Sequence, residues 1–182
     1  MTGNGKGNLK SDDMDFLELA KKRFSARSYR PDKVEKEKTD YILECARVAP
    51  SAVNRQPWRF LVIESDEKRR LVQECYSRDW LKEAPLYIVV CAEYPAAWTR
   101  KYDGKNHGDI DASIAVKHIC LAAVDVGLGS CWVCNFNVAK LSSSLCLPQG
   151  TTPVAIVPIG YAASGPEQPS ARKPLDEIVE YL

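Results

Sequence analysis

The chain has 182 residues, and its 25 lysines and arginines almost balance 24 aspartates and glutamates. This length suits one domain, and a formal net charge of +1 gives no general attraction to the phosphates of nucleic acids. The most apolar stretch, residues 110–129, is interrupted by Lys117, His118 and Asp125, so it is not typical of a membrane span. We therefore expect a globular protein that binds neither nucleic acid nor a membrane.

The N-terminal residues are polar, rich in glycine, asparagine and lysine, and lack the apolar segment of a secretory signal. We expect a flexible lead over residues 1–12 and a single domain over residues 13–182. Seven cysteines, an odd number, lie mostly within apolar runs. This usage is typical of small buried residues in a reducing compartment and predicts a cytoplasmic protein.

In the first half of the chain, apolar spacing predicts three helices and two strands. Asp12 and Asp13 are placed to cap a helix that runs to Lys22, and a second helix covers about residues 35–48 before Pro50. A strand follows at residues 58–63. Next come an exposed amphipathic helix at residues 66–76 and a buried strand at residues 86–92.

In the second half, residues 93–108 have no clear period, and the helix predicted at residues 109–126 is apolar nearly all round. Such a helix must be buried on several sides, and Gly127 suits its end. Strands at residues 128–134 and 153–161 flank a short helix at about 138–145, and a last helix starts at Leu175. Pro158 suggests an edge strand or a bulge. The interleaved elements predict an α+β or mixed α/β class, with one layered domain around a central helix.

The motifs of dinucleotide folds, phosphate-binding loops and serine hydrolases are absent. His107 with Asp109 and Asp111 lacks the tight spacing of a metal site, so no metal is expected. Cys131 and Cys134 have Cys-x-x-Cys spacing but lie in a strand-like run rather than at the start of a helix. Buried packing is therefore the default for these two thiols, and a redox pair is the minor alternative.

Four segments carry groups that a core does not need. In the first, Arg23, Ser25 and Arg27 would share one side of an extended chain. Two guanidiniums and a hydroxyl arranged in this way suit a phosphate or a polyol phosphate. Taken alone, this segment is more typical of a solvated basic turn.

The second segment is a loop between Pro50 and Pro57, with Ser51, Asn54 and Gln56. Hydroxyl and amide groups in a stiff loop can bind the hydrogen-bonding edge of a planar ring. An ordinary polar turn has the same composition and stays an alternative.

The last two segments lie in the second half of the chain. Residues 127–132 contain two glycines, which permit close approach of the backbone to a ligand. Residues 160–161 end a predicted strand, and Arg172 and Lys173 add two cations near a predicted helix start.

Taken in order, these segments resemble the nitroreductase family of FMN-dependent oxidoreductases. The matching motifs lie at residues 23–27, 49–60, 111–132 and 153–161, with Arg-Lys-Pro-Leu at 172–175. The resemblance implies an α+β three-layer sandwich with a central mixed sheet and a buried central helix. It also implies a homodimer with FMN at the subunit interface.

Cofactor-binding residues follow from the resemblance, position by position. The FMN phosphate, ribityl chain and ring edge would be held by Arg23, Ser25 and Arg27. The flavin of the other subunit would be reached by a loop with Pro50, Ser51, Ala52, Asn54 and Gln56. One face of the ring would be lined by Trp132, Val133 and Cys134, and the phosphate would gain contacts from Arg172 and Lys173.

The implied activity is hydride transfer from NAD(P)H through the flavin N5 to a nitroaromatic, quinone or similar conjugated acceptor, in a ping-pong cycle. Because the flavin carries the chemistry, no side chain is expected as a catalytic acid or base. Trp98, Tyr102 and His107 are candidates for an acceptor lid. Two alternatives stay open. One is a specialised flavin enzyme of the same fold, such as a reductive dehalogenase or a flavin-consuming enzyme, and the other is a non-catalytic FMN-binding protein.

Overall fold

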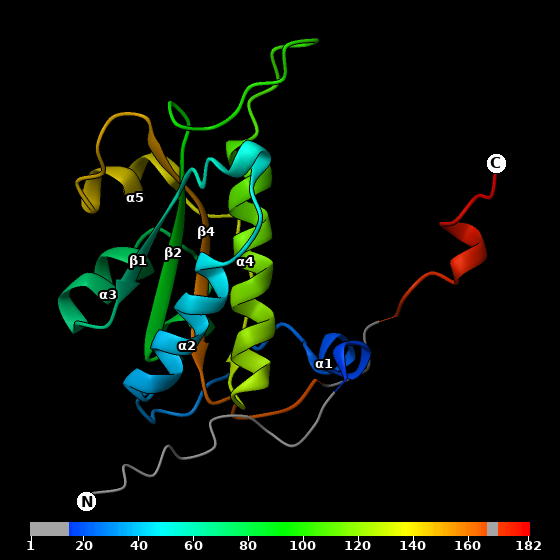
Figure 1. Cartoon of the computed structure of the whole chain (residues 1–182). Coiled ribbons are helices and arrows are strands. Elements are labelled where there is room, and N and C mark those ends of the chain that lie inside the picture. Colours follow the sequence, from blue (N-terminus) through cyan, green and yellow to red (C-terminus); the bar gives the residue numbers. More distant parts are fainter. Residues whose placement is uncertain (1–14, 167–170) are drawn as a thin grey trace, which may run out of the picture.

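A computed structural model describes residues 15–166 and 171–182. Four antiparallel strands form one sheet in the spatial order β1-β2-β4-β3 (Figure 1). The strands are β1 (Trp58–Ile63), β2 (Leu86–Glu93), β3 (Gly129–Ser130) and β4 (Thr151–Gly160).

Helices cover both faces of this sheet, which confirms the predicted α+β sandwich. One face packs on α2 (Lys36–Arg47) and α4 (Gly108–Asp125), and the other on α3 (Asp66–Gln73) and α5 (Val138–Ser144). The short helix α1 (Phe16–Lys22) lies beside α4. Because both faces are covered, every residue from Leu86 to Ala92 is buried. This burial explains the unbroken apolar run of β2, since an antiparallel strand with one wet face would alternate.

The central helix α4 buries only part of its circumference within this chain. Ala112, Ala115, Val116 and Ile119 are fully buried against α2 and the sheet, whereas Ile110 on the outer face is 38% exposed. The helix ends as predicted at Gly127, whose φ is +76°. The amide of Leu128 then donates to the carbonyl of Ala123 at 2.7 Å, which is the closing bond of a Schellman cap.

Three sheet predictions need correction. All four strands pair antiparallel, and among the described residues the parallel pairing is a single bridge between Ser25 and Ser130. Strand β3 has two residues instead of the seven predicted at 128–134. Pro158 lies in the interior strand β4. It faces Cys131, just beyond the end of β3, and the amide of Cys131 donates to its carbonyl at 3.4 Å.

Several helix boundaries also differ from the sequence prediction. Helix α3 ends at Gln73, and the C-terminal helix is a single 3-10 turn, Leu175–Glu177. Asp12 and Asp13 lie outside the described residues, and the side chain of Asp15 caps α1 by accepting from the amide of Glu18 at 2.9 Å. In the described part of the chain, no helix has the length and apolar character needed to cross a membrane.

Candidate functional site

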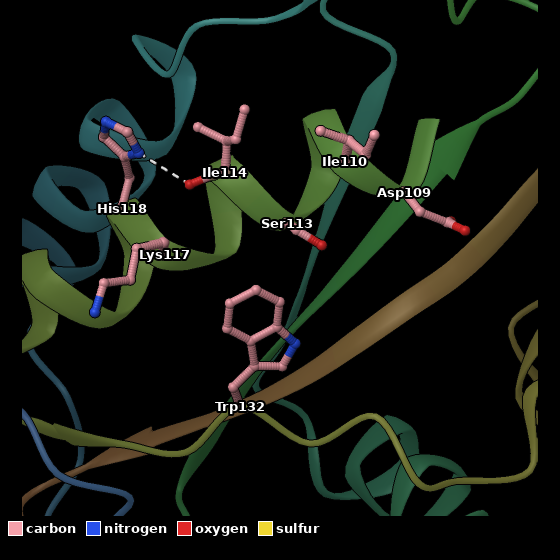
Figure 2. Close-up of a pocket in the computed structure, with 7 residues that line it drawn as sticks. All are labelled: Asp109, Ile110, Ser113, Ile114, Lys117, His118 and Trp132. Atoms are coloured by element: carbon pink, nitrogen blue, oxygen red, sulfur yellow. Dashed lines mark hydrogen bonds between the residues drawn. The ribbon is translucent and has the colours of Figure 1, made fainter. Parts of the chain in front are cut away.

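An open groove of about 540 Å³ runs along the outer face of α4 (Figure 2). Spacing of three and four residues along the helix places the lining side chains on one face. Trp132, which follows β3, forms the opposite wall, and its indole lies on the side of the helix from which Ser113 and Lys117 project. The lining residues are Asp109, Ile110, Ser113, Ile114, Lys117, His118 and Trp132. An apolar floor with a cation near one end suits a flat ring system that carries negative charge.

The segment after β3 alternates between the core and this groove. Cys131 and Val133 are buried, whereas Trp132 and Cys134 are exposed. The amide of Val133 donates to the carbonyl of Ile156 at 3.0 Å, which holds the segment against β4. Trp132 therefore lines the groove, and Cys134 is exposed outside the lining. The side chain of Val133 belongs to the core, so only its backbone is available to a ligand.

The basic segment that contains Arg23, Ser25 and Arg27 runs extended beside β3. Ser25 bridges Ser130, and the amide of Ala26 donates to the carbonyl of Ser130 at 3.0 Å. A Cβ at Gly129 would stand 2.9 Å from the Cβ of Ala26. Gly129 is thus required for packing of the chain on itself, which corrects the expectation that this glycine admits a ligand.

Cations gather near one end of the groove without carboxylate partners. In the described part of the chain, Arg23, Arg27 and Lys117 form no ion pair. Burial and the charge of Arg23 lower the pKa of Lys117, with a smaller effect from Arg172. The oxygen Oγ of Ser130 is buried nearby, against the thiol of Cys120. Like charges without counter-ions favour an anion such as a phosphate.

Lys117 is the site residue that sequence reasoning missed. The sequence does contain a signal for it, because a lysine in a helix that is apolar nearly all round marks a face that the chain's own core does not bury. Arg172 and Lys173, which were predicted, are exposed in the C-terminal segment that leaves the body of the molecule.

The loop of residues 51–56 lies near the opposite end of α4. The amide of Ala52 donates to Oδ1 of Asp111 at 2.9 Å, in the first turns of the helix. Within the loop, the amide of Gln56 donates to Oγ of Ser51 at 2.8 Å, and its side-chain amide donates to Oδ1 of Asn54 at 3.1 Å. One chain therefore keeps the predicted loop residues apart from the predicted phosphate residues.

The lid candidates form a projecting hairpin above α4 (Figure 1). Thr99 bridges Asn106, and the rings of Trp98 and His107 meet edge to face at its base, with centroids 4.7 Å apart. Tyr102, near the tip, is 99% exposed. None of the three lid candidates lines the groove of Figure 2.

The thiol and metal alternatives find little support in the geometry. Burial raises the pKa of the Cys131 thiol, whereas a redox pair needs a lowered pKa. Asp109 accepts from the hydroxyl of Tyr94 at 2.6 Å and Asp111 accepts from Ala52, so the two carboxylates serve different partners. Within residues 15–166 and 171–182, no cluster of three histidine, cysteine or acidic side chains is arranged to hold a metal.

Comparison with known proteins matches both the fold and the motifs. A family model described as "Nitroreductase family" matches residues 20–78 and 72–161. The crystal structure of a nitroreductase family protein from Clostridium difficile 630 is 43% identical, with a TM-score of 0.87 over 92% of this chain and 98% of that one. An FMN-dependent nitroreductase from Clostridium difficile R20291 is 32% identical, with a TM-score of 0.76 over 91% of this chain and 98% of that one.

A sequence relative from Methanothermobacter thermautotrophicus carries the names NADH dehydrogenase and NAD(P)H nitroreductase. It is 32% identical over 163 residues, which are 84% of this chain and 80% of that protein. The family model spans most of the chain, and the sequence motifs fall in the same order on the same fold. The chain belongs to the nitroreductase family.

Proposed function

We propose that this chain is an FMN-dependent oxidoreductase that takes hydride from NAD(P)H and reduces a nitroaromatic, a quinone or a similar conjugated acceptor. The observation that carries this proposal is the set of cations around the apolar groove of Trp132. Lys117 lines the groove within electrostatic reach of Arg23, and Arg27 lies within reach of Cys131, the neighbour of Trp132. FMN joins a phosphate to a flat ring system, and these two features match its two parts. The names of the archaeal relative and of the FMN-dependent C. difficile enzyme support the same reductant and cofactor.

The residues present fit FMN in both charge and shape. Arg23 and Lys117 would bind the phosphate, and the Ser25 hydroxyl suits the ribityl chain. The ring system would lie on the apolar floor between Ile114 and Trp132. Arg172 and Lys173 would add positive charge to the phosphate from the C-terminal segment.

When bound, FMN would supply the redox chemistry, by accepting hydride from the nicotinamide and releasing it to the acceptor in a second half-reaction. The protein binds, orients and tunes the cofactor. Arg27 would stabilise negative charge at the pyrimidine end of the ring system. Apolar walls that exclude water strengthen this electrostatic interaction.

We also propose that the working unit is a homodimer in which two copies share each flavin. Three observations support it: the outer face of α4 is open, the loop of residues 51–56 lies far along α4 from the cations of its own chain, and the C-terminal segment exposes its apolar side chains. In that segment Leu175 is 74% exposed and Tyr181 95% exposed. A second copy would cover these surfaces and bring Pro50, Ser51, Ala52, Asn54 and Gln56 to its partner's flavin. Removal of residues 175–182 should therefore convert a dimer to a monomer in sedimentation velocity.

Acceptor choice would reside in the projecting hairpin, with Trp98, Tyr102 and His107 as lid residues. The hairpin projects from the body and has two aromatic rings at its base, which suits a loop that covers a conjugated molecule. All seven cysteines are free, which supports a reducing compartment, and we propose the cytoplasm.

The main test is spectroscopic. The purified protein should be yellow, or become so with added FMN, and NADH or NADPH should bleach the flavin band without oxygen. Acceptors added next should restore the band, and a panel of nitroaromatics, quinones, halogenated phenols and free flavins would rank the specialised alternatives. A protein that takes up no FMN contradicts the proposal. A yellow protein that neither nucleotide bleaches would instead indicate a non-catalytic FMN-binding protein.

A further inference from the structure

Asp111 is a buried carboxylate that the proposed chemistry does not use. Its residue is 1% exposed, and Oδ1 accepts from the amide of Ala52 at 2.9 Å. The other oxygen, Oδ2, is buried and has no hydrogen-bond partner among the described residues. A buried carboxylate with an unpartnered oxygen destabilises a fold. A functional role for its bond to Ala52 would account for its presence.

That contact holds a loop in an unusual backbone conformation. Val53, Asn54 and Gln56 have φ values of 54°, 54° and 51°, in the left-handed region that non-glycine residues rarely adopt. Val53 is β-branched, which makes this conformation especially costly, and it is 73% exposed, so burial does not compensate. Strain of this kind persists only where surrounding contacts over-determine the backbone.

The contacts inside the loop do not tie it to the body. The amides of Asn54 and Gln56 donate to the backbone and side chain of Ser51, which makes the turn self-contained. The bond from Ala52 to Asp111 instead joins the loop to α4 across 59 positions of sequence. The guanidinium of Arg55 adds a longer bond to the carbonyl of Ala96 at 3.4 Å, through a side chain. The bond of Ala52 is the short one, and it holds the backbone of the turn on α4.

We propose that Asp111 is a positioning residue, whose carboxylate holds residues 51–56 in the strained shape that contacts the flavin of a second copy. This inference rests on the proposed function for the identity of the ligand. Asp111 itself touches no cofactor atom and acts through Ala52. The stiffness of the loop lowers the entropy lost when it docks, which strengthens binding without a new contact.

Two substitutions at Asp111 distinguish the effect of its hydrogen-bond acceptor from the effect of its side-chain volume. Asp111→Leu fills a similar volume without an acceptor, and Asp111→Asn keeps an oxygen for Ala52. In the protein without FMN, Asp111→Leu should speed amide exchange of Ala52 and tryptic cleavage after Arg55 by at least tenfold. With FMN it should raise the dissociation constant at least tenfold and change the visible circular dichroism of the bound flavin. Asp111→Asn should stay within about threefold of the wild type in every measurement.

The matched control is Asp125→Leu, which removes a carboxylate of the same helix that bonds Tyr41 of α2. It should leave Ala52 exchange and cleavage after Arg55 unchanged. If Asp111→Leu does not fold, the wild type still decides: the Ala52 amide should exchange at least ten times more slowly than that of Arg55, whose bond lies within the loop.

Different results would overturn the two proposals. Equal exchange of Ala52 and Arg55, or an Asp111→Asn variant as impaired as Asp111→Leu, contradicts the role of Asp111. Failure of the wild type to bind FMN contradicts the proposed function, while exchange and cleavage still report on how Asp111 holds the loop.

Discussion

The two faces of α4 are both apolar, but they serve different purposes. The inner face consists of small and β-branched residues that are fully buried, such as Ala115 and Ile119. The outer face places Ile110, Ile114 and Lys117 along an open groove. A helix that is apolar all round thus builds the fold with one side and offers the other to a ligand or a second copy. Substitutions on the two faces should therefore have separable effects.

The largest expected effect is on the inner face. Ile119→Asp would place a carboxylate among fully buried apolar side chains, which should lower the free energy of unfolding by about 3–5 kcal/mol or prevent folding. Ile110→Asp, on the outer face, should change it by less than about 1 kcal/mol while weakening FMN binding. Urea denaturation of both variants measures the difference, and equal losses would contradict a functional distinction between the faces.

The next effect concerns the ligand side alone. Arg27→Ala should weaken FMN binding about 10- to 100-fold, which corresponds to about 1.5–3 kcal/mol for a hydrogen bond to a charged group. It should also lower the flavin's midpoint potential, because positive charge favours the reduced anion. Arg30→Ala is the control, since Arg30 pairs with Asp32 away from the groove. Full occupancy and an unchanged potential in Arg27→Ala would remove Arg27 from the site.

The next effect concerns a buried thiol of the interior, Cys91 in β2. Burial raises the pKa of Cys91 to about 12, whereas a thiol in an unfolded chain has a pKa near about 8.5. Above that lower value the unfolded chain loses its proton first, so this contribution to stability is complete below about pH 8.5 and declines toward pH 12. The expected decline is at most about 1.4 kcal/mol per pH unit. Thermal melting from pH 8 to 11 should show it, and Cys91→Ala should flatten the slope.

The smallest effect is expected at Lys117, which is partly exposed to water. Lys117→Gln should weaken FMN binding about three- to tenfold, and the loss should shrink at high salt because the interaction is electrostatic. Lys36→Gln, whose ammonium pairs with Asp40 outside the groove, should leave FMN binding unchanged. A salt-independent loss in Lys117→Gln would indicate a steric role rather than a charge.

Much of the fold was predictable because its signals are local. Gly127 ended α4 as expected, and the unbroken apolar run of residues 86–92 marked the most buried strand. Strand direction and the short length of β3 depend on which backbone lies alongside, and residue patterns do not specify that. The C-terminal helix was overestimated because the apolar side chains of its segment, among them Leu175 and Tyr181, are exposed rather than packed against the described residues. Short helices depend on such packing.

The site divides in the same way. The alternation of Arg23, Ser25 and Arg27 predicted an extended segment, and Ser25 does bridge Ser130 beside β3. Their contact with a flavin stays a prediction. Lys117 joins them only through the packing of α1 and the basic segment against α4. Asp111 lies near His107 in the sequence, and nothing in the sequence links it to Ala52. Contacts between residues distant in sequence are created by the fold and were therefore missed.

The Schellman cap at Gly127 affects how the groove can vary among related proteins. It turns the chain so that Trp132 returns under the helix it has just left, and all the residues that line the groove lie within the continuous stretch 109–132. The groove is thus a local unit, built from neighbours in sequence rather than assembled from distant segments. A relative could acquire the shape of the groove by exchange of this one stretch, which brings β3 with it and leaves the other three strands as they are.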